Sequence, residues 1–171
     1  VAGETTPFTA YSRGDLTRTM SSGLSANIVI DSRDSPIYPT TGVHWNASVR
    51  GFSPSLGGDQ SWQELWSDFR AYPRMGKNPM DVLAIWVTLW TTYGPAPYLD
   101  LPAIGWDTFG KSGRGYVQGR LRAPNQIYTE LEYRKVLTKD GLLGATVFVN
   151  GTSSTLNSGT FSEFDPGAGI G

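Results

Sequence analysis

The sequence contains no cysteine, a single histidine and almost no net charge, with a formal value of −1. The absence of cysteine excludes a disulfide framework and a thiolate metal site. The balanced charge gives no reason to expect nucleic acid as a partner. A run of about 18 apolar residues is also missing, so the sequence predicts no transmembrane helix. We therefore expect no metal, no cofactor and no nucleic acid.

Apolar and polar residues alternate with a period of two in six segments. The six segments are residues 24–31, 43–50, 64–71, 83–93, 127–134 and 143–150. In the clearest one, Leu83, Ile85, Val87 and Leu89 lie on one side and Thr88 lies on the other. Such alternation indicates strands, and no segment shows a competing helical period. The last residues, 167–171, read as the start of a further strand.

The links between these segments differ in length. Tight or turn-rich links are expected at residues 31–42, 76–79 and 139–141, and longer ones at 53–61, 94–125 and 151–167. Short turns at one rim and long loops at the other are typical of outer-membrane barrels, whose strands need only about 9–11 residues. The predicted fold class is all-β, a partial antiparallel transmembrane β-barrel of about seven strands. A soluble β-sandwich that binds carbohydrate through aromatic residues is the less favoured alternative.

The link at residues 94–125 is too long to be an idle connection in a compact domain. Its apolar residues, Leu101, Ile104 and Trp106 among them, predict that it folds back into the barrel interior. Within it, Arg114 lies between two glycines. Glycines permit a close backbone approach, and an arginine can deliver a bidentate cation to a buried acidic partner.

The residues that could carry catalysis or bind a metal have simpler interpretations. His44 has no second metal ligand nearby in sequence and is expected to be a polar residue of the barrel interior. The carboxylates at residues 31–34 lack calcium-loop spacing and suit a turn. Glu130 and Glu132 share a strand face, but Arg134 would keep both ionised, so a glycosidase pair is disfavoured. No nucleophile elbow is present, and we predict no catalytic residue and no enzyme.

Four motifs resemble those of the BamA/TamA family of outer-membrane assembly factors, also called bacterial surface antigens. They are Asp31-Ser-Arg-Asp-Ser-Pro36 with Pro39-Thr-Thr-Gly42, Arg114-Gly-Tyr116 with Gly119-Arg120, Glu132-Tyr-Arg134, and Phe148-Val-Asn150-Gly151. Their order and spacing match the family over most of residues 23–171. Val49-Arg50-Gly51-Phe52 also spells the arginine motif, but it lacks the downstream Gly-Arg and the Glu-Tyr-Arg strand. We therefore assign the motif to Arg114.

The resemblance implies a barrel of about sixteen strands whose sixth extracellular loop tucks into the lumen. It assigns Arg114, Gly115, Tyr116, Gly119 and Arg120 to the lumen-loop motif, and Glu130, Glu132, Arg134, Phe148 and Asn150 to the strands that anchor this loop. Asp31, Arg33, Asp34, Pro36 and Gly42 form the turn motif. The family usually has Asp where this sequence has Asn150, so a neutral hydrogen bond is expected there instead of an ion pair.

The resemblance also sets the expected domains and function. Residues 1–22 are expected to be the remnant of a preceding strand or loop, and residues 23–171 a partial barrel with its lumen loop at 94–125. The implied function is to insert, assemble or translocate proteins at the bacterial outer membrane. Expected partners are outer-membrane lipids, client outer-membrane or secreted proteins, POTRA repeats in a longer chain and accessory lipoproteins. A passive pore, or the barrel anchor of a secretion system or fused enzyme, is the alternative. By itself, this piece is expected to have unpaired edges and no function.

Overall fold

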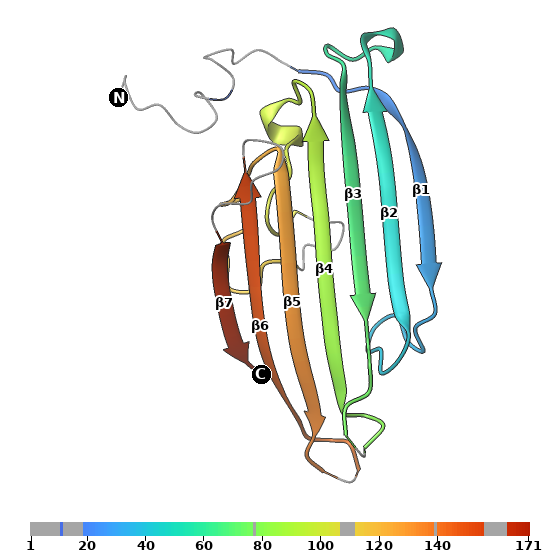
Figure 1. Cartoon of the computed structure of the whole chain (residues 1–171), viewed down its shortest axis with the longest axis vertical. Coiled ribbons are helices and arrows are strands. Elements are labelled where there is room, and N and C mark those ends of the chain that lie inside the picture. The colour runs from blue at the N-terminus through green and yellow to red at the C-terminus, as the bar shows by residue number, and fades with distance from the viewer. Residues whose placement is uncertain (1–10, 12–18, 77, 107–111, 139, 156–163) are drawn as a thin grey trace, which may run out of the picture.

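The computed structural model describes residues 11, 19–76, 78–106, 112–138, 140–155 and 164–171. They form one seven-stranded antiparallel sheet in which each strand pairs with the next along the chain (Figure 1). The strands are β1 (Gly23–Asp31), β2 (Val43–Phe52), β3 (Trp62–Ala71), β4 (Val82–Tyr93), β5 (Asn125–Val136), β6 (Gly144–Thr155) and β7 (Phe164–Ile170). Two 3-10 helices, η1 (Pro54–Leu56) and η2 (Tyr98–Asp100), lie in the links. The all-β antiparallel prediction is confirmed.

The sequence predicted a link at residues 151–167, and both of its predicted ends are wrong. β6 continues to Thr155, where it pairs with Asn125 of β5, and β7 begins at Phe164. Residues 151–155 are glycine, serine and threonine throughout, so no apolar alternation marks them as a strand. Pairing with β5 holds them in the sheet instead. The segment expected to precede the barrel, residues 1–22, lies outside the described residues except for Tyr11 and residues 19–22.

The strand register gives the sheet two distinct faces. One carries a row of aligned polar residues, in which His44, Arg70, Trp86, Glu130 and Asn150 are successive neighbours across five strands. We call it the loop-covered face, because the link between β4 and β5 lies over it. The opposite, outer face carries the exposed residues Leu24, Ile28, Ile30, Val43, Trp45, Val49, Phe69, Leu131, Val147, Val149, Phe164 and Ile170.

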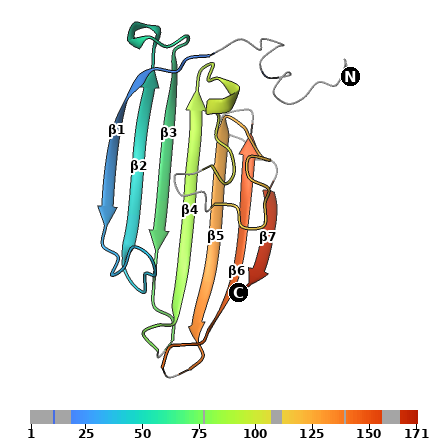
Figure 2. The ribbon, with the colours of Figure 1, turned by 180° about the vertical axis from the view of Figure 1, so that it is seen from behind.

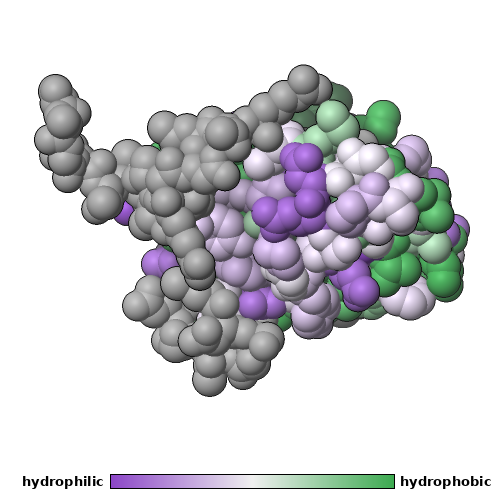
Figure 3. Space-filling view, turned by 90° about the horizontal axis from the view of Figure 1, so that it is seen from above, coloured by the Kyte–Doolittle hydropathy of each residue, from purple (hydrophilic) through white to green (hydrophobic). Residues whose placement is uncertain are grey.

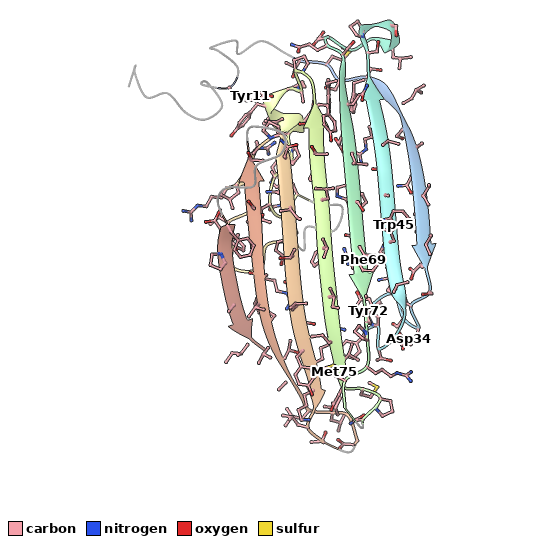
Figure 4. All side chains as sticks on the ribbon, in the orientation of Figure 1. Tyr11, Asp34, Trp45, Phe69, Tyr72 and Met75 are labelled. Carbon is pink, nitrogen blue, oxygen red and sulfur yellow. The ribbon has the colours of Figure 1, made fainter. Side chains whose placement is uncertain are left out.

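Burial in this sheet is the reverse of that in a soluble protein. Phe69 on the outer face is 40% exposed, whereas Glu132 on the loop-covered face is 4% exposed. Trp45 and Phe69, which are neighbours across β2 and β3, are labelled in Figure 4. Viewed from the rim with the long loops, hydrophilic residues occupy the middle and hydrophobic ones gather toward the border (Figure 3). Apolar residues outside and polar residues inside are the pattern of a membrane barrel wall.

The exposure of the two faces also bears on the β-sandwich alternative. A sandwich needs a second sheet packed on the apolar face. The described strands form a single sheet, and large apolar residues on its outer face remain exposed. The sandwich prediction is therefore wrong. No helix among the described residues is long and apolar enough to cross a membrane.

The links separate onto two rims, as the sequence predicted. Residues 53–61 and 94–124 leave the sheet at one rim, and residues 32–42, 72–81 and 137–143 lie at the other (Figure 1). A small apolar cluster stabilises each rim. Trp62, Ala96 and Leu101 form the first cluster beside η2, and Tyr72, Val82 and Ala84 form the second at the opposite rim.

Candidate functional site

The link between β4 and β5, the long loop (residues 94–124), folds back across the sheet, passing in front of β5 and β6 in Figure 2. Its two halves pair with each other. Ile104 N–H donates to Leu121 O at 3.0 Å, and Gly119 N–H donates to Ile104 O at 2.8 Å. Ile104 is 1% exposed. The pairing makes an irregular hairpin and directs its tip toward β5 and β6.

The shape of the loop tip depends on glycine at position 113. Gly113 has a φ of 78°, which side-chain-bearing residues rarely adopt. A Cβ atom built there would lie 2.4 Å from Cγ1 of Ile104, so no larger residue fits. The Tyr116 N–H donates to Gly113 O at 2.9 Å and closes the turn. This turn presents Arg114 to the sheet.

Arg114 contacts two buried glutamates of the following strand. Its Nη1 donates to Oε2 of Glu132, and its Nη2 lies 3.6 Å from Oε1 of Glu130. The guanidinium carbon lies 4.8 Å from the centre of the Phe148 ring on β6. The Arg114 side chain is 41% exposed, whereas the two glutamate side chains are 5–6% exposed. The arginine therefore brings the compensating charge to carboxylates that water hardly reaches.

Asn150 on β6 also ties the same tip to the sheet, through a hydrogen bond between uncharged groups. Asn150 Nδ2 donates to Arg114 O at 3.1 Å and lies 3.2 Å from the Tyr128 hydroxyl. The Tyr128 hydroxyl donates to Glu130 Oε2 at 2.6 Å. Asn150 thus makes a neutral hydrogen bond to the loop, but to its main chain and as the donor. An aspartate could not donate to that carbonyl oxygen.

The remaining residues of the lumen-loop motif have separate contacts. The Tyr116 hydroxyl donates to the main-chain oxygen of Asp165 on β7, at 2.5 Å. Gly115 has a φ of 85° and lies next to Arg114 in the turn. Among the described residues, the Arg120 guanidinium has no ion pair, and its N–H donates to Val117 O at 3.1 Å. The tip is therefore held to β5, β6 and β7, whereas Arg120 does not take part in this contact.

Arg134 does not touch the loop tip but contacts Glu132 from the other side. Its Nε donates to Glu132 Oε1 at 2.5 Å. Its Nη1 donates to Pro39 O, in the link between β1 and β2, at 3.2 Å. The two oxygens of the Glu132 carboxylate thus bind two different arginines, Arg114 and Arg134.

The sequence-predicted turn motif forms a compact structure at the opposite rim, which we call the turn segment (residues 32–42). Asp31 and Arg33 form a two-point ion pair, at 2.9 and 2.7 Å. Asp34 Oδ1 accepts from the Thr40 N–H at 2.8 Å, and Oδ2 accepts from its hydroxyl at 2.6 Å. These bonds, the one from the hydroxyl first, lower the pKa of Asp34 to about 2.

Two further motif residues complete this turn segment. Pro36 offers its carbonyl oxygen to Arg33 Nη1 at 3.5 Å. Gly42 has a φ of 94°, and a Cβ atom there would lie 2.3 Å from Ser32 O. His44, two positions after Gly42, places Nδ1 3.2 Å from Oδ2 of Asp31 on the loop-covered face. Over the described residues, no group of three or more His, Asp or Glu side chains could hold a metal.

Sequence reasoning missed Arg122, which organises the base of the long loop. Its Nη1 donates to the carbonyl oxygens of Tyr98, Leu99 and Leu101 at 3.0, 2.9 and 3.1 Å. Its guanidinium also lies 4.8 Å from the Trp106 ring. Burial lowers the pKa of Arg122. Main-chain acceptors exist at every residue, so no sequence motif announces such a site. Arg50, of the Arg50-Gly51-Phe52 sequence, instead pairs with Glu64 within the sheet, at 3.1 Å.

Comparisons with known proteins bear on the fold. No protein-family model matches the sequence, and no curated protein matches it. Among solved structures, the crystal structure of BamA from Haemophilus ducreyi lacking POTRA domains 1–3 matches with a TM-score of 0.71 and 18% sequence identity. The match covers 86% of this chain and 35% of that one, so the chain spans about a third of its length. The sheet therefore has the fold of part of a BamA-like barrel.

Proposed function

We propose that this chain is part of a BamA/TamA-family protein that inserts, assembles or translocates other proteins at the bacterial outer membrane. The fold likeness and the apolar outer face support a barrel wall in contact with outer-membrane lipids. The observation that carries the proposal is the contact of Arg114 with Glu130 and Glu132. It joins the tip of a long loop to the loop-covered face of the sheet, which would be the inside of the barrel wall.

The proposed role is structural and needs no catalytic residue. Client strands would pair with an exposed barrel edge, because an unpaired edge offers main-chain donors and acceptors to an incoming strand. The long loop would preserve the shape of the barrel while that edge opens, and Arg114 would keep the loop in the lumen. Residues 23–171 would form this part of the barrel, with POTRA repeats and accessory lipoproteins as further partners of the longer protein.

The test is Arg114→Ala in the full-length protein. It leaves two nearly buried glutamates without their charged partner on the loop, so the loop should detach from β5. We expect lower levels of assembled client barrels in cells, and loss of the heat-dependent gel shift of the folded barrel. Arg114→Lys should recover little, because one ammonium cannot replace a planar two-point donor. Arg74→Ala, at an exposed arginine of the opposite rim, is the matched control.

Two outcomes would contradict the proposal in different ways. Normal client assembly and a normal gel shift in Arg114→Ala would show that the contact has no role in assembly. Altered single-channel conductance with unchanged client levels would favour the passive pore or barrel anchor instead.

The membrane location has its own test. Val87 and Thr88 are consecutive on β4 and point to opposite faces, and Thr88 is 6% exposed on the loop-covered side. We expect a lipid-soluble thiol reagent to label a cysteine at position 87 and not one at position 88. Equal labelling of both positions in outer-membrane preparations would argue against a lipid-facing outer surface.

A further inference from the structure

We propose that Arg134 is a positioning residue that couples the long loop to the turn segment on the opposite rim, so that the two elements dock and detach together. This inference rests on the proposed role of Arg114 as the loop anchor. The inference adds the turn segment as a second element held against the loop-covered face. It also gives Arg114 a second arginine, Arg134, that shares its glutamate.

The coupling starts at the Glu132 carboxylate. Glu132 is 4% exposed, and each of its oxygens binds one guanidinium, Oε2 that of Arg114 and Oε1 that of Arg134. A carboxylate whose two oxygens are each held by a planar guanidinium has a defined orientation. Arg134 therefore sets the direction from which Glu132 meets Arg114.

The second step is the grip of Arg134 on the turn segment. Its Nη1 donates to Pro39 O, and its guanidinium carbon lies 5.0 Å from the Tyr38 ring and 5.8 Å from the Tyr72 ring. The Arg134 side chain is 17% exposed. One guanidinium thus binds a carboxylate, a carbonyl oxygen and an aromatic face at once. A lysine could not make these three contacts together.

The sheet leaves room for this contact. Ala84 and Val82 on β4 are the register neighbours of Glu132 and Arg134. Beside these small side chains the turn segment reaches inward far enough for the Pro39 carbonyl oxygen to meet Arg134. Tyr72, labelled in Figure 4, packs against both, and its N–H donates to Gly42 O at 3.0 Å.

Internal hydrogen bonds hold the turn segment together. Asp34 binds the main-chain N–H groups of Thr40 and Thr41, at 2.8 and 3.2 Å, directly after Pro39. Ser32 N–H donates to Val43 O at 2.9 Å. A pull on Pro39 is therefore transmitted to the whole segment. Loss of the Arg114 contact would disturb the carboxylate that orients Arg134, and with it the turn segment.

The experiment is hydrogen–deuterium exchange of the full-length protein, purified without clients, followed by mass spectrometry. Arg134→Ala should speed exchange about tenfold or more at residues 32–42 and at 112–119, as loss of a charge-assisted hydrogen bond allows. The decisive variant is Arg114→Ala, because among the described residues the Arg114 side chain has no hydrogen bond or ion pair with the turn segment. Its removal can therefore act there only through Glu132 and Arg134. It should also speed exchange at residues 32–42. Arg134→Lys should behave as Arg134→Ala does.

Controls separate coupling from general loosening. Arg122→Ala should loosen the long loop around η2 while exchange at residues 32–42 stays at the wild-type rate. Wild-type exchange of the turn segment in Arg114→Ala would overturn the coupling, and so would full rescue by Arg134→Lys, because charge alone would then suffice. Since no client is present, these results do not depend on whether the protein assembles other barrels.

Discussion

Arg114 and Arg122 lie eight positions apart in one loop and hold it by opposite means. Arg114 leaves the loop to meet carboxylates on β5, whereas Arg122 binds three carbonyl oxygens of the loop itself. The first contact joins two parts of the molecule, and the second shapes one part internally. The difference indicates which substitutions change the position of the loop and which change only its local order.

Solvent access separates the two contacts further. Removal of Arg114 leaves glutamates that the sheet has already shielded from water. Removal of Arg122 frees three carbonyl oxygens, one of which belongs to Leu99, a residue that is 64% exposed, so water can replace the lost donor there. A lost partner is costly where water cannot take its place.

The largest effect is expected for Glu132→Ala. It removes the shared partner of Arg114 and Arg134, and should lower the free energy of unfolding by about 3 kcal/mol. Urea titration of the full-length protein in lipid bilayers would measure the loss. Glu132→Gln keeps the size and one acceptor and should lose less. A loss below about 1 kcal/mol would place this pair with ordinary surface ion pairs.

A smaller effect is expected for Asn150→Ala, which removes the neutral bond to the Arg114 carbonyl. The loss should be about 1–2 kcal/mol, as for a buried hydrogen bond. Asn150→Asp offers a sharper comparison, because aspartate keeps the shape but cannot donate. If unfolding shows that Asn150→Asp is as stable as the wild type, the amide donor is not what holds the tip.

Arg122→Ala should lower stability by about 1 kcal/mol, because water can reach the Leu99 carbonyl oxygen that the substitution frees. The change should be confined to residues 94–106 in amide exchange, with the Arg114 contact retained. A loss as large as that of Glu132→Ala would erase the distinction between the two arginines. Arg122→Lys, which keeps the charge, should restore only part of the order.

The smallest effect concerns the turn segment and acid. The bonds from Thr40 lower the pKa of Asp34 from 3.8 to about 2, so ionised Asp34 stabilises the turn above pH 3.8. That contribution should disappear as the pH falls through about 2. NMR of the residues around Thr40 during acid titration would follow it. In Asp34→Asn the same signals should show no transition in this range.

The sequence predicted the strands and their two faces well, for a physical reason. A wall between lipid and a polar interior requires apolar and polar residues to alternate along each strand, as in β4. This alternation can be read directly from the amino-acid sequence. It failed at residues 151–155, where both faces are polar and only pairing with β5 marks the strand. The Arg114 contact with Glu132 was expected from the motif order.

Contacts between segments that are distant in the chain could not be predicted as well from the sequence. Arg134 and Pro39 are 95 positions apart, and the acceptor is a main-chain oxygen that any residue could supply. The bond from Tyr116 to the Asp165 carbonyl has the same character. The sequence identified Arg134 as an anchor for the long loop. Its contact with the turn segment follows only from the inward fold of that segment toward β5.

The shared carboxylate also affects the electric field on the loop-covered face. Arg114 and Arg134 alternate in space with Glu130 and Glu132, so their formal charges cancel within a few side-chain lengths. The four side chains carry no net charge, so the potential of the cluster decays with distance faster than that of a single charge. At long range the cluster therefore acts on a passing ion more weakly than one unpaired charge would. A preference for cations or anions in a barrel built on this sheet would depend more on unpaired charges elsewhere than on this cluster.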